Sequence, residues 1–128
     1  MTILIIGGGG YVGSLLVKKL IERKMNVLVL DLFMYGSPEI VFSGFHDSEH
    51  LQTIKGDLRD IDLIENLISK TDNIIHLACI SNDPSFELNP NLGKSINYDS
   101  FYPLIKACKK KNKQIYLCFI FFSLWNKK

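Results

Sequence analysis

Seven residues near the start of the chain, Gly7 to Gly13, have the composition of a site for a negatively charged group. They read Gly-Gly-Gly-Gly-Tyr-Val-Gly and stand between an aliphatic run, Thr2 to Ile6, and an amphipathic segment, Tyr11 to Lys24. Such a turn needs backbone angles that residues with a Cβ avoid, and an anion reaches the main chain only where side chains are absent. The positive end of the following helix attracts a diphosphate. The turn therefore predicts a diphosphate site, with a purely structural strand-to-helix turn as the alternative.

Two glycine spacings overlap in this turn. Gly8, Gly10 and Gly13 fit the pattern G-x-G-x-x-G, whereas Gly7, Gly10 and Gly13 fit the wider G-x-x-G-x-x-G. In both patterns the last glycine, Gly13, lets the helix pack closely against the strand. The turn by itself does not choose between the two patterns.

A carboxylate follows at the distance used in dinucleotide-binding chains. Asp31 ends a second aliphatic run, Val27 to Leu30, and comes 18 residues after Gly13. This is near the spacing of about 20 at which an acidic residue binds the adenosine ribose hydroxyls. Asp31 would repel a 2′-phosphate, and residues 32–36 contain no Arg or Lys that could neutralise one. We therefore predict NAD rather than NADP as the cofactor; the alternative is that Asp31 is a solvated turn residue.

Strand and helix patterns alternate along the rest of the chain, and this alternation positions the glycine turn. It predicts an α/β fold, a doubly wound parallel sheet of the Rossmann type with about five strands. Between Asp31 and His50 only a short helix is expected. The later expected elements are a strand at Leu51 to Lys55, a helix at Ile61 to Ser69 capped by Asp60, a strand at Asn73 to Ala78, a helix at Asn91 to Lys113 kinked by Pro103, and a strand at Ile115 to Phe122.

The composition is that of one globular domain covering residues 1–128. Hydrophobic residues make up 47% and charged residues 22%, with a formal net charge of +2, which argues against disorder and against nucleic acid as a partner. Cys79, Cys108 and Cys118 lack the spacing of a metal site, so we predict reduced thiols and no metal. The apolar runs are too short for a signal peptide or a membrane span. A cytoplasmic chain with no membrane partner is expected.

Two further strings, Gly56-Asp57-Leu58 and His76-Leu77-Ala78, complete a resemblance to a known family. The chain resembles the extended short-chain dehydrogenase/reductase family, and in particular its NAD-dependent nucleotide-sugar epimerases and dehydratases, from about Thr2 to about Tyr116. The string Ile6 to Ser14 is similar to the family's T-G-G-x-G-Y-I-G-S. Asp31 to Gly36 is similar to its ribose-binding strand end and following loop. The resemblance favours the wider glycine pattern.

The resemblance also implies roles for individual residues. The amides of Tyr11 and Val12 would bind the pyrophosphate, and Asp57 beside Leu58 would accept a hydrogen bond from the adenine amino group. Asp57 as a turn or helix-capping residue is an equal alternative, and His76 is interpreted as a core histidine. The full set of predicted cofactor-binding residues is Gly7, Gly10, Tyr11, Val12, Gly13, Asp31, Asp57, Leu58, Leu77, Ala78, Cys79 and, near the nicotinamide half, Asn97.

The family's catalytic residues are not recognisable in the sequence. Its members carry a Ser or Thr after the fifth strand and a Tyr-x-x-x-Lys pair on the next helix, where the tyrosine acts as acid and base. Here only Tyr102 and Lys106 have that spacing, and they precede the fifth strand with Pro103 between them, so we interpret the pair as a coincidence. Ser123 is not assigned the serine role. No catalytic residue is therefore predicted.

We interpret the chain as the NAD-binding portion of a nucleotide-sugar epimerase or dehydratase, catalytically incomplete as sequenced. The C-terminal substrate domain is absent, and residues 115–128 form a divergent apolar tail, for which a truncated or frame-shifted gene is the hypothesis. A nucleotide sugar would bind only if the missing half were supplied. The alternative is a non-enzymatic NAD-binding or interaction module. A third hypothesis is self-association through the exposed apolar C-terminal strand.

Overall fold

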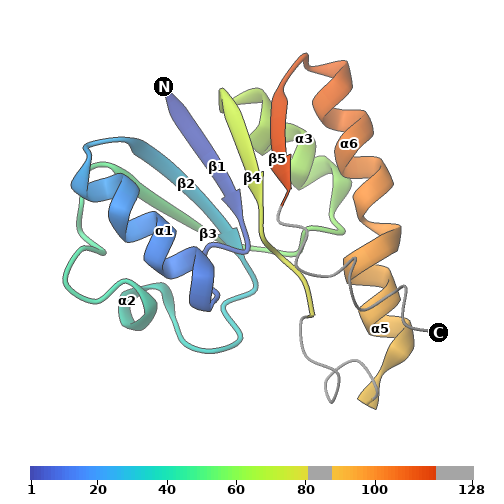
Figure 1. The fold of residues 1–128 in the computed structure, drawn as a ribbon, viewed down its shortest axis with the longest axis horizontal. Helices are drawn as coiled ribbons and strands as arrows, with labels where there is room; N and C mark the ends of the chain where they lie inside the picture. The colour runs from blue at the N-terminus through green and yellow to red at the C-terminus, as the bar shows by residue number, and fades with distance from the viewer. Residues whose placement is uncertain (81–87, 118–128) are drawn as a thin grey trace.

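The fold is that of a parallel sheet whose strand order reverses beside its first strand. The computed structural model describes residues 1–80 and 88–117, and the statements below refer to these. The sheet order is β3-β2-β1-β4-β5, and each neighbouring pair is parallel. This arrangement confirms the predicted doubly wound fold (Figure 1). The strands are β1 (Thr2–Ile6), β2 (Asn26–Asp31), β3 (Leu51–Lys55), β4 (Asn73–His76) and β5 (Gln114–Leu117).

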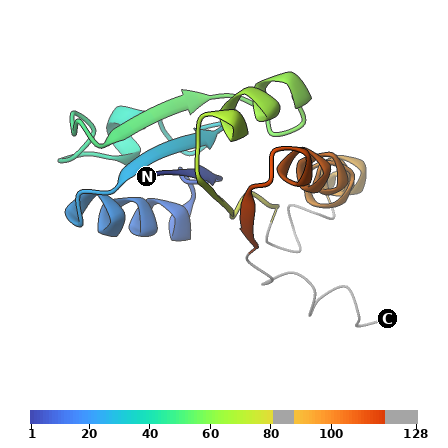
Figure 2. The same cartoon turned by 90° about the horizontal axis from the view of Figure 1, so that it is seen from above.

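Helices cover both faces of the sheet, so its central strands are buried on both sides. Helix α1 lies on one face and helices α3 and α6 lie on the other (Figure 2). Successive side chains of β1 alternate between two cores, with Ile3 and Ile5 in one and Leu4 and Ile6 in the other. This two-sided burial explains the unbroken aliphatic run of β1. The helices are α1 (Tyr11–Glu22), α2 (Pro38–Val41), α3 (Ile61–Ser69), α5 (Pro90–Lys94) and α6 (Phe101–Lys110).

Most element boundaries follow the sequence patterns. The Asp60 carboxylate accepts a hydrogen bond from Leu63 N at 3.1 Å, as expected of the α3 N-cap. Helix α1 ends at Glu22, two residues earlier than predicted, because Lys24 adopts a left-handed φ of 58°. Strand β4 ends at His76 rather than Ala78. For β5 the structure gives Gln114–Leu117, and the predicted residues 118–122 lie outside the described part of the chain.

The long helix predicted over Asn91 to Lys113 consists of three segments. Between α5 and α6 the backbone forms a π-helical turn, η1 (Ser95–Asp99), in which Ser100 N donates to Ser95 O at 3.2 Å. The irregularity therefore lies before Pro103 and not at it. Pro103 has no amide hydrogen to donate and its ring crowds the carbonyl four residues earlier, that of Asp99, where the wider turn ends.

No helix in the described part of the chain is both long enough and apolar enough to cross a membrane.

Candidate functional site

A groove of about 530 Å³ opens where the strand order reverses, at the carboxyl ends of β1, β2 and β4. Open α/β sheets bind their ligands at this position, because the loops on either side of the reversal diverge. The groove brings together residues from five separate parts of the sequence. Those predicted to bind the cofactor that line it are Gly7, Gly10, Asp31, Asp57, Leu58, Leu77, Ala78 and Cys79.

Two glycines of the turn are required by the packing of the protein itself. Gly7 has a φ of 86°, and a Cβ there would lie 2.5 Å from Ala78 N. A Cβ on Gly13 would overlap the carbonyl oxygen of Gly7. Gly7 and Gly13 are the end positions of the wider glycine pattern. Gly8 is also tightly packed, because a Cβ there would lie 2.8 Å from a Cγ atom of the buried Val29.

Gly10 is different, because its surroundings in the described protein leave room for a side chain. A Cβ there would have one neighbour within 4 Å, the Gly7 carbonyl oxygen at 3.5 Å, which is ordinary contact. Gly10 nevertheless lines the groove and is the N-cap of α1, in an extended conformation with no side-chain cap. The described residues around Gly10 therefore give no steric reason for a glycine at this position.

The first turn of α1 presents backbone donors beside this space. Ser14 N makes the first helical hydrogen bond, to Gly10 O at 2.9 Å. The amides of Tyr11 and Val12 precede it and have no partner within the helix. Their side chains are 87% and 50% exposed and do not line the groove. The amides and the positive end of the helix together favour an anion here.

Asp31 is held against the glycine turn. Its Oδ2 accepts from Gly9 N at 2.8 Å and its Oδ1 accepts from Phe33 N at 2.8 Å. A carboxylate has about four acceptor positions, so about two are left for hydroxyl groups of a ligand. The side chain is partly buried and lines the groove, unlike the solvated turn residue considered as the alternative.

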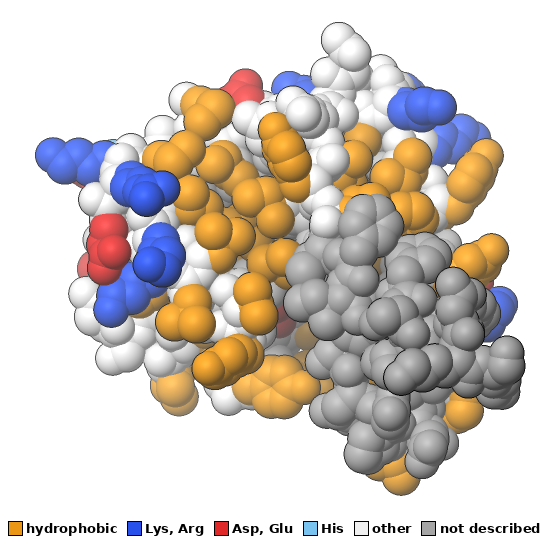
Figure 3. Space-filling view, viewed as in Figure 1, with side chains coloured by type: hydrophobic (Ala, Val, Ile, Leu, Met, Phe, Trp, Pro, Cys, Tyr) orange, Lys and Arg blue, Asp and Glu red, His pale blue; other side chains and the backbone are white. Residues whose placement is uncertain are grey.

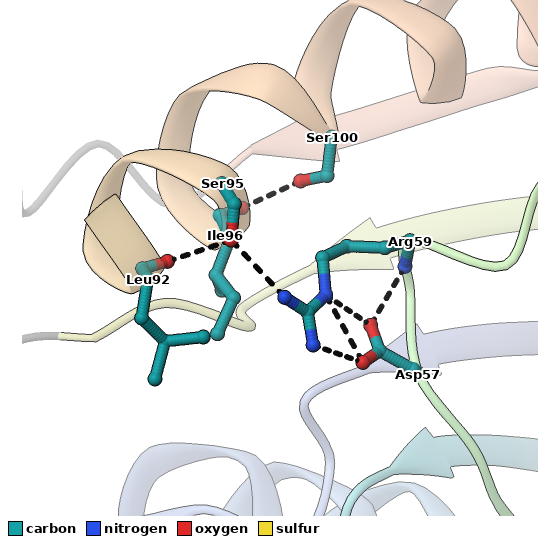
Figure 4. A network of polar contacts seen from close by, with 6 residues as sticks. All are labelled: Asp57, Arg59, Leu92, Ser95, Ile96 and Ser100. Atoms are coloured by element: carbon teal, nitrogen blue, oxygen red, sulfur yellow. Dashed lines mark hydrogen bonds and ion pairs between the residues drawn. The ribbon is translucent and has the colours of Figure 1, made fainter.

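Asp57, in the turn between β3 and α3, lines the groove and forms an ion pair with Arg59 (Figure 4). Its Oδ1 accepts from the backbone N and from Nε of Arg59, both at 2.9 Å. Its Oδ2 accepts from Nη2 at 2.5 Å and from Nε at 3.0 Å. These hydrogen bonds lower the pKa of the Asp57 carboxyl, because they stabilise its charged form. Asp57 is thus a turn residue that also lines the groove, and Asp60 caps α3 instead.

Asn97 is not on the groove surface but supports it. Its amide oxygen accepts from Ile80 N at 2.8 Å, and its amide nitrogen donates to Ile80 O at 3.0 Å. Asn97 lies on η1, so this pair of bonds holds the segment after β4 against the π-helical turn. Ile80 itself lines the groove. Asn97, which was predicted to lie near the nicotinamide half, therefore holds Ile80 in place in the groove wall.

His76 and the Tyr102–Lys106 pair lie outside the groove lining. Burial lowers the pKa of His76 to about 4, so its ring is neutral at pH 7, and its buried Nδ1 has no hydrogen-bond partner among the described residues. This environment is that of a histidine in the core. Tyr102 is 74% exposed on α6, and Lys106 is exposed one turn later.

Several residues that line the groove were not predicted from the sequence. Arg59 was overlooked although it follows Asp57 at the i+2 spacing at which an aspartate binds a nearby backbone amide. Met34 and Tyr35 line the groove after β2, and both are largely exposed. Exposed apolar side chains gather on the face of the molecule that carries α1 (Figure 3). Leu92 and Ile96 line the opposite wall.

Comparison with known proteins gives one family. The model of the "NAD dependent epimerase/dehydratase family" matches residues 3–123. UDP-glucuronic acid decarboxylase 4 of Arabidopsis thaliana is 33% identical over 90 residues, which are 70% of this chain and 19% of that protein. UDP-glucose 4-epimerase of Lacticaseibacillus casei is 34% identical over 92 residues, 70% of this chain and 26% of that protein. The chain thus spans about a fifth to a quarter of these two relatives.

Solved structures show the same fold. A UDP-N-acetylglucosamine 4-epimerase of Methanobrevibacter ruminantium superposes with a TM-score of 0.77 at 29% identity, covering 88% of this chain and 35% of that one. The Bordetella bronchiseptica enzyme WbmG, solved in complex with NAD, superposes with a TM-score of 0.77 at 27% identity. The match covers 91% of this chain and 36% of that one.

Proposed function

We propose, because this chain belongs to the NAD-dependent epimerase/dehydratase family, that its groove binds NAD. The pyrophosphate would lie at the amides of Tyr11 and Val12, and the adenosine ribose at Asp31. The adenine would lie beside Asp57 and Leu58, and the nicotinamide half would extend along Leu77, Ala78 and Cys79. This assignment uses the residues that the sequence predicts, with Gly7, Gly10 and Gly13 shaping the turn.

The main support for this proposal is the free space beside Gly10. The packing around Gly7 and Gly13 explains why those positions lack a side chain, but no described residue gives such a reason at Gly10. A ligand in close contact with the main chain would supply one. Because the position is the N-cap of α1 and opens onto the groove, the favoured ligand is an anion such as a diphosphate.

We propose further that the protein acts on a nucleotide sugar. The two UDP-sugar relatives named above support this substrate class, and NAD when bound would supply a hydride acceptor. The described residues of the groove would hold and orient the cofactor. They contain no Tyr-x-x-x-Lys pair, so the acid/base group would have to come from elsewhere.

Two further proposals concern the setting of the chain. We place it in the cytoplasm, since the buried Cys108 is a free thiol, as is usual in reducing compartments.

We also propose that β5 mediates self-association, because it is the last strand of the sheet and pairs only with β4 among the described residues. Sedimentation at several concentrations tests this; a monomer throughout would contradict it.

Thermal unfolding with added nucleotides tests the main proposal. A ligand that binds only the folded chain adds about 2.7 kcal/mol at 100 times its dissociation constant, so NAD should raise the unfolding midpoint. NADP is the control, and it should stabilise less because its 2′-phosphate would approach the Asp31 carboxylate. Absence of a shift with NAD at millimolar concentration would overturn the assignment.

A further inference from the structure

Arg59 connects the two walls of the groove at the end proposed for adenine. On one wall it pairs with Asp57, in the turn between β3 and α3, and both line the groove. Its remaining terminal nitrogen, Nη1, donates to Ser95 Oγ at 3.1 Å, at the start of η1 (Figure 4). Ser95 Oγ in turn donates to Leu92 O at 2.9 Å. The guanidinium is therefore fixed from both sides.

The pairing leaves Asp57 with limited hydrogen-bonding capacity. Three donor groups of Arg59 occupy its two oxygens, namely the backbone N, Nε and Nη2. The single Nε–H is shared between the two oxygens, so three N–H groups fill about three of the four acceptor positions of a carboxylate and about one is left for a ligand. Asp57 lines the groove, so this position can receive a single N–H donor from a bound base.

We propose that Arg59 is a positioning residue that fixes the Asp57 carboxylate so that its last acceptor position selects a base carrying an exocyclic amino group. Ser95 assists by holding the guanidinium against rotation. Hypoxanthine has a carbonyl oxygen where adenine has the amino group, and that oxygen would face the carboxylate without a hydrogen between them. This inference rests on the proposed NAD site and assigns Arg59 and Ser95 a role in its base selectivity.

The test measures dissociation constants for NAD and for nicotinamide hypoxanthine dinucleotide by calorimetry. One hydrogen bond to a charged acceptor gives the unaltered chain a preference of about tenfold for NAD. Arg59→Lys keeps the positive charge but loses the planar donor pair, so the preference should fall to about twofold while the affinity for the hypoxanthine analogue changes little. Ser95→Ala should reduce the preference by a smaller factor.

Lys110→Ala is the matched control. It removes the exposed ion pair between Lys110 Nζ and Glu65 Oε1, which are 3.5 Å apart. This ion pair joins α6 to α3 away from the groove. It should leave both dissociation constants unchanged. Thermal unfolding without ligand checks that each variant is folded.

The outcomes separate this inference from the proposed function. If the unaltered chain binds NAD but does not prefer it to the analogue, or if Arg59→Lys keeps the full preference, the role of Arg59 is overturned while NAD binding stands. An equal loss of affinity for both dinucleotides in Arg59→Lys would also overturn it, because that result indicates a general structural role. If neither dinucleotide binds the unaltered chain, the proposed function fails and this inference fails with it.

Discussion

Gly10→Ala separates the two reasons for which a glycine turn can exist. If the turn had only a structural role, the substitution would change the free energy of unfolding and leave NAD binding by the folded chain unchanged. The added methyl group would have one neighbour within 4 Å, Gly7 O at 3.5 Å, and the backbone angles of −77° and 178° are open to alanine. A weaker N-cap costs a few tenths of a kcal/mol or more, and lower entropy of the unfolded chain returns about 0.4–1 kcal/mol. The unfolding free energy without ligand should therefore change by less than about 1 kcal/mol.

Binding of NAD should respond far more strongly. Because Gly10 lines the groove next to the first turn of α1, the methyl group would take up space in which we propose that the diphosphate meets the amides of Tyr11 and Val12. Two hydrogen bonds to a charged group are together worth about 3 kcal/mol, and that loss corresponds to an affinity lower by about 100-fold. Calorimetric titration with NAD, paired with denaturant unfolding of the free chain, measures both quantities.

Gly13→Ala is the comparison variant, since its Cβ would overlap the Gly7 carbonyl oxygen. It should lose about 3 kcal/mol of stability even without ligand, because the β1–α1 turn must shift. NAD binding by Gly10→Ala as tight as that of the unaltered chain would contradict a role for Gly10 in the groove. A loss of stability in Gly10→Ala as large as that in Gly13→Ala would contradict it equally.

Two further predictions concern stability. The pKa of His76 is about 4 in the folded chain and about 6.5 when unfolded, so the unfolded state binds the extra proton first and stability falls as the pH drops from 6.5 towards 4. Denaturant unfolding should show about 2 kcal/mol lost between pH 7.5 and pH 5, and His76→Gln should show a pH dependence smaller by that amount; an unchanged slope would contradict the burial of the ring. Asp60→Ala removes the α3 N-cap bond to Leu63 N and should cost about 1 kcal/mol, whereas Asp62→Ala, next in the chain and without that bond, should cost less.

Local sequence patterns were enough to predict the elements whose signals lie within a few residues of one another. Strands β1 and β3 and helix α3 have the predicted bounds, because aliphatic runs and a capping aspartate act over one or two turns of chain. The parallel sheet followed from the alternation of these elements. The glycine turn and Asp31 could be recognised for the same reason, since their spacing along the chain is itself the signal.

Which of these residues come into contact, and how many hydrogen-bonding positions each has left for a ligand, depends on the packing of the folded chain. Arg59 reaches Ser95, 36 residues away, only because α3 and β4 lie between them and return the chain to the same edge of the sheet. Asn97 likewise reaches Ile80 from 17 residues away. The difference between Gly10 and Gly13 depends in the same way on atoms brought close by folding. Local patterns specify conformation, but the space and the hydrogen-bonding capacity left at a site depend on how the crossovers pack, and no short stretch of sequence encodes that packing.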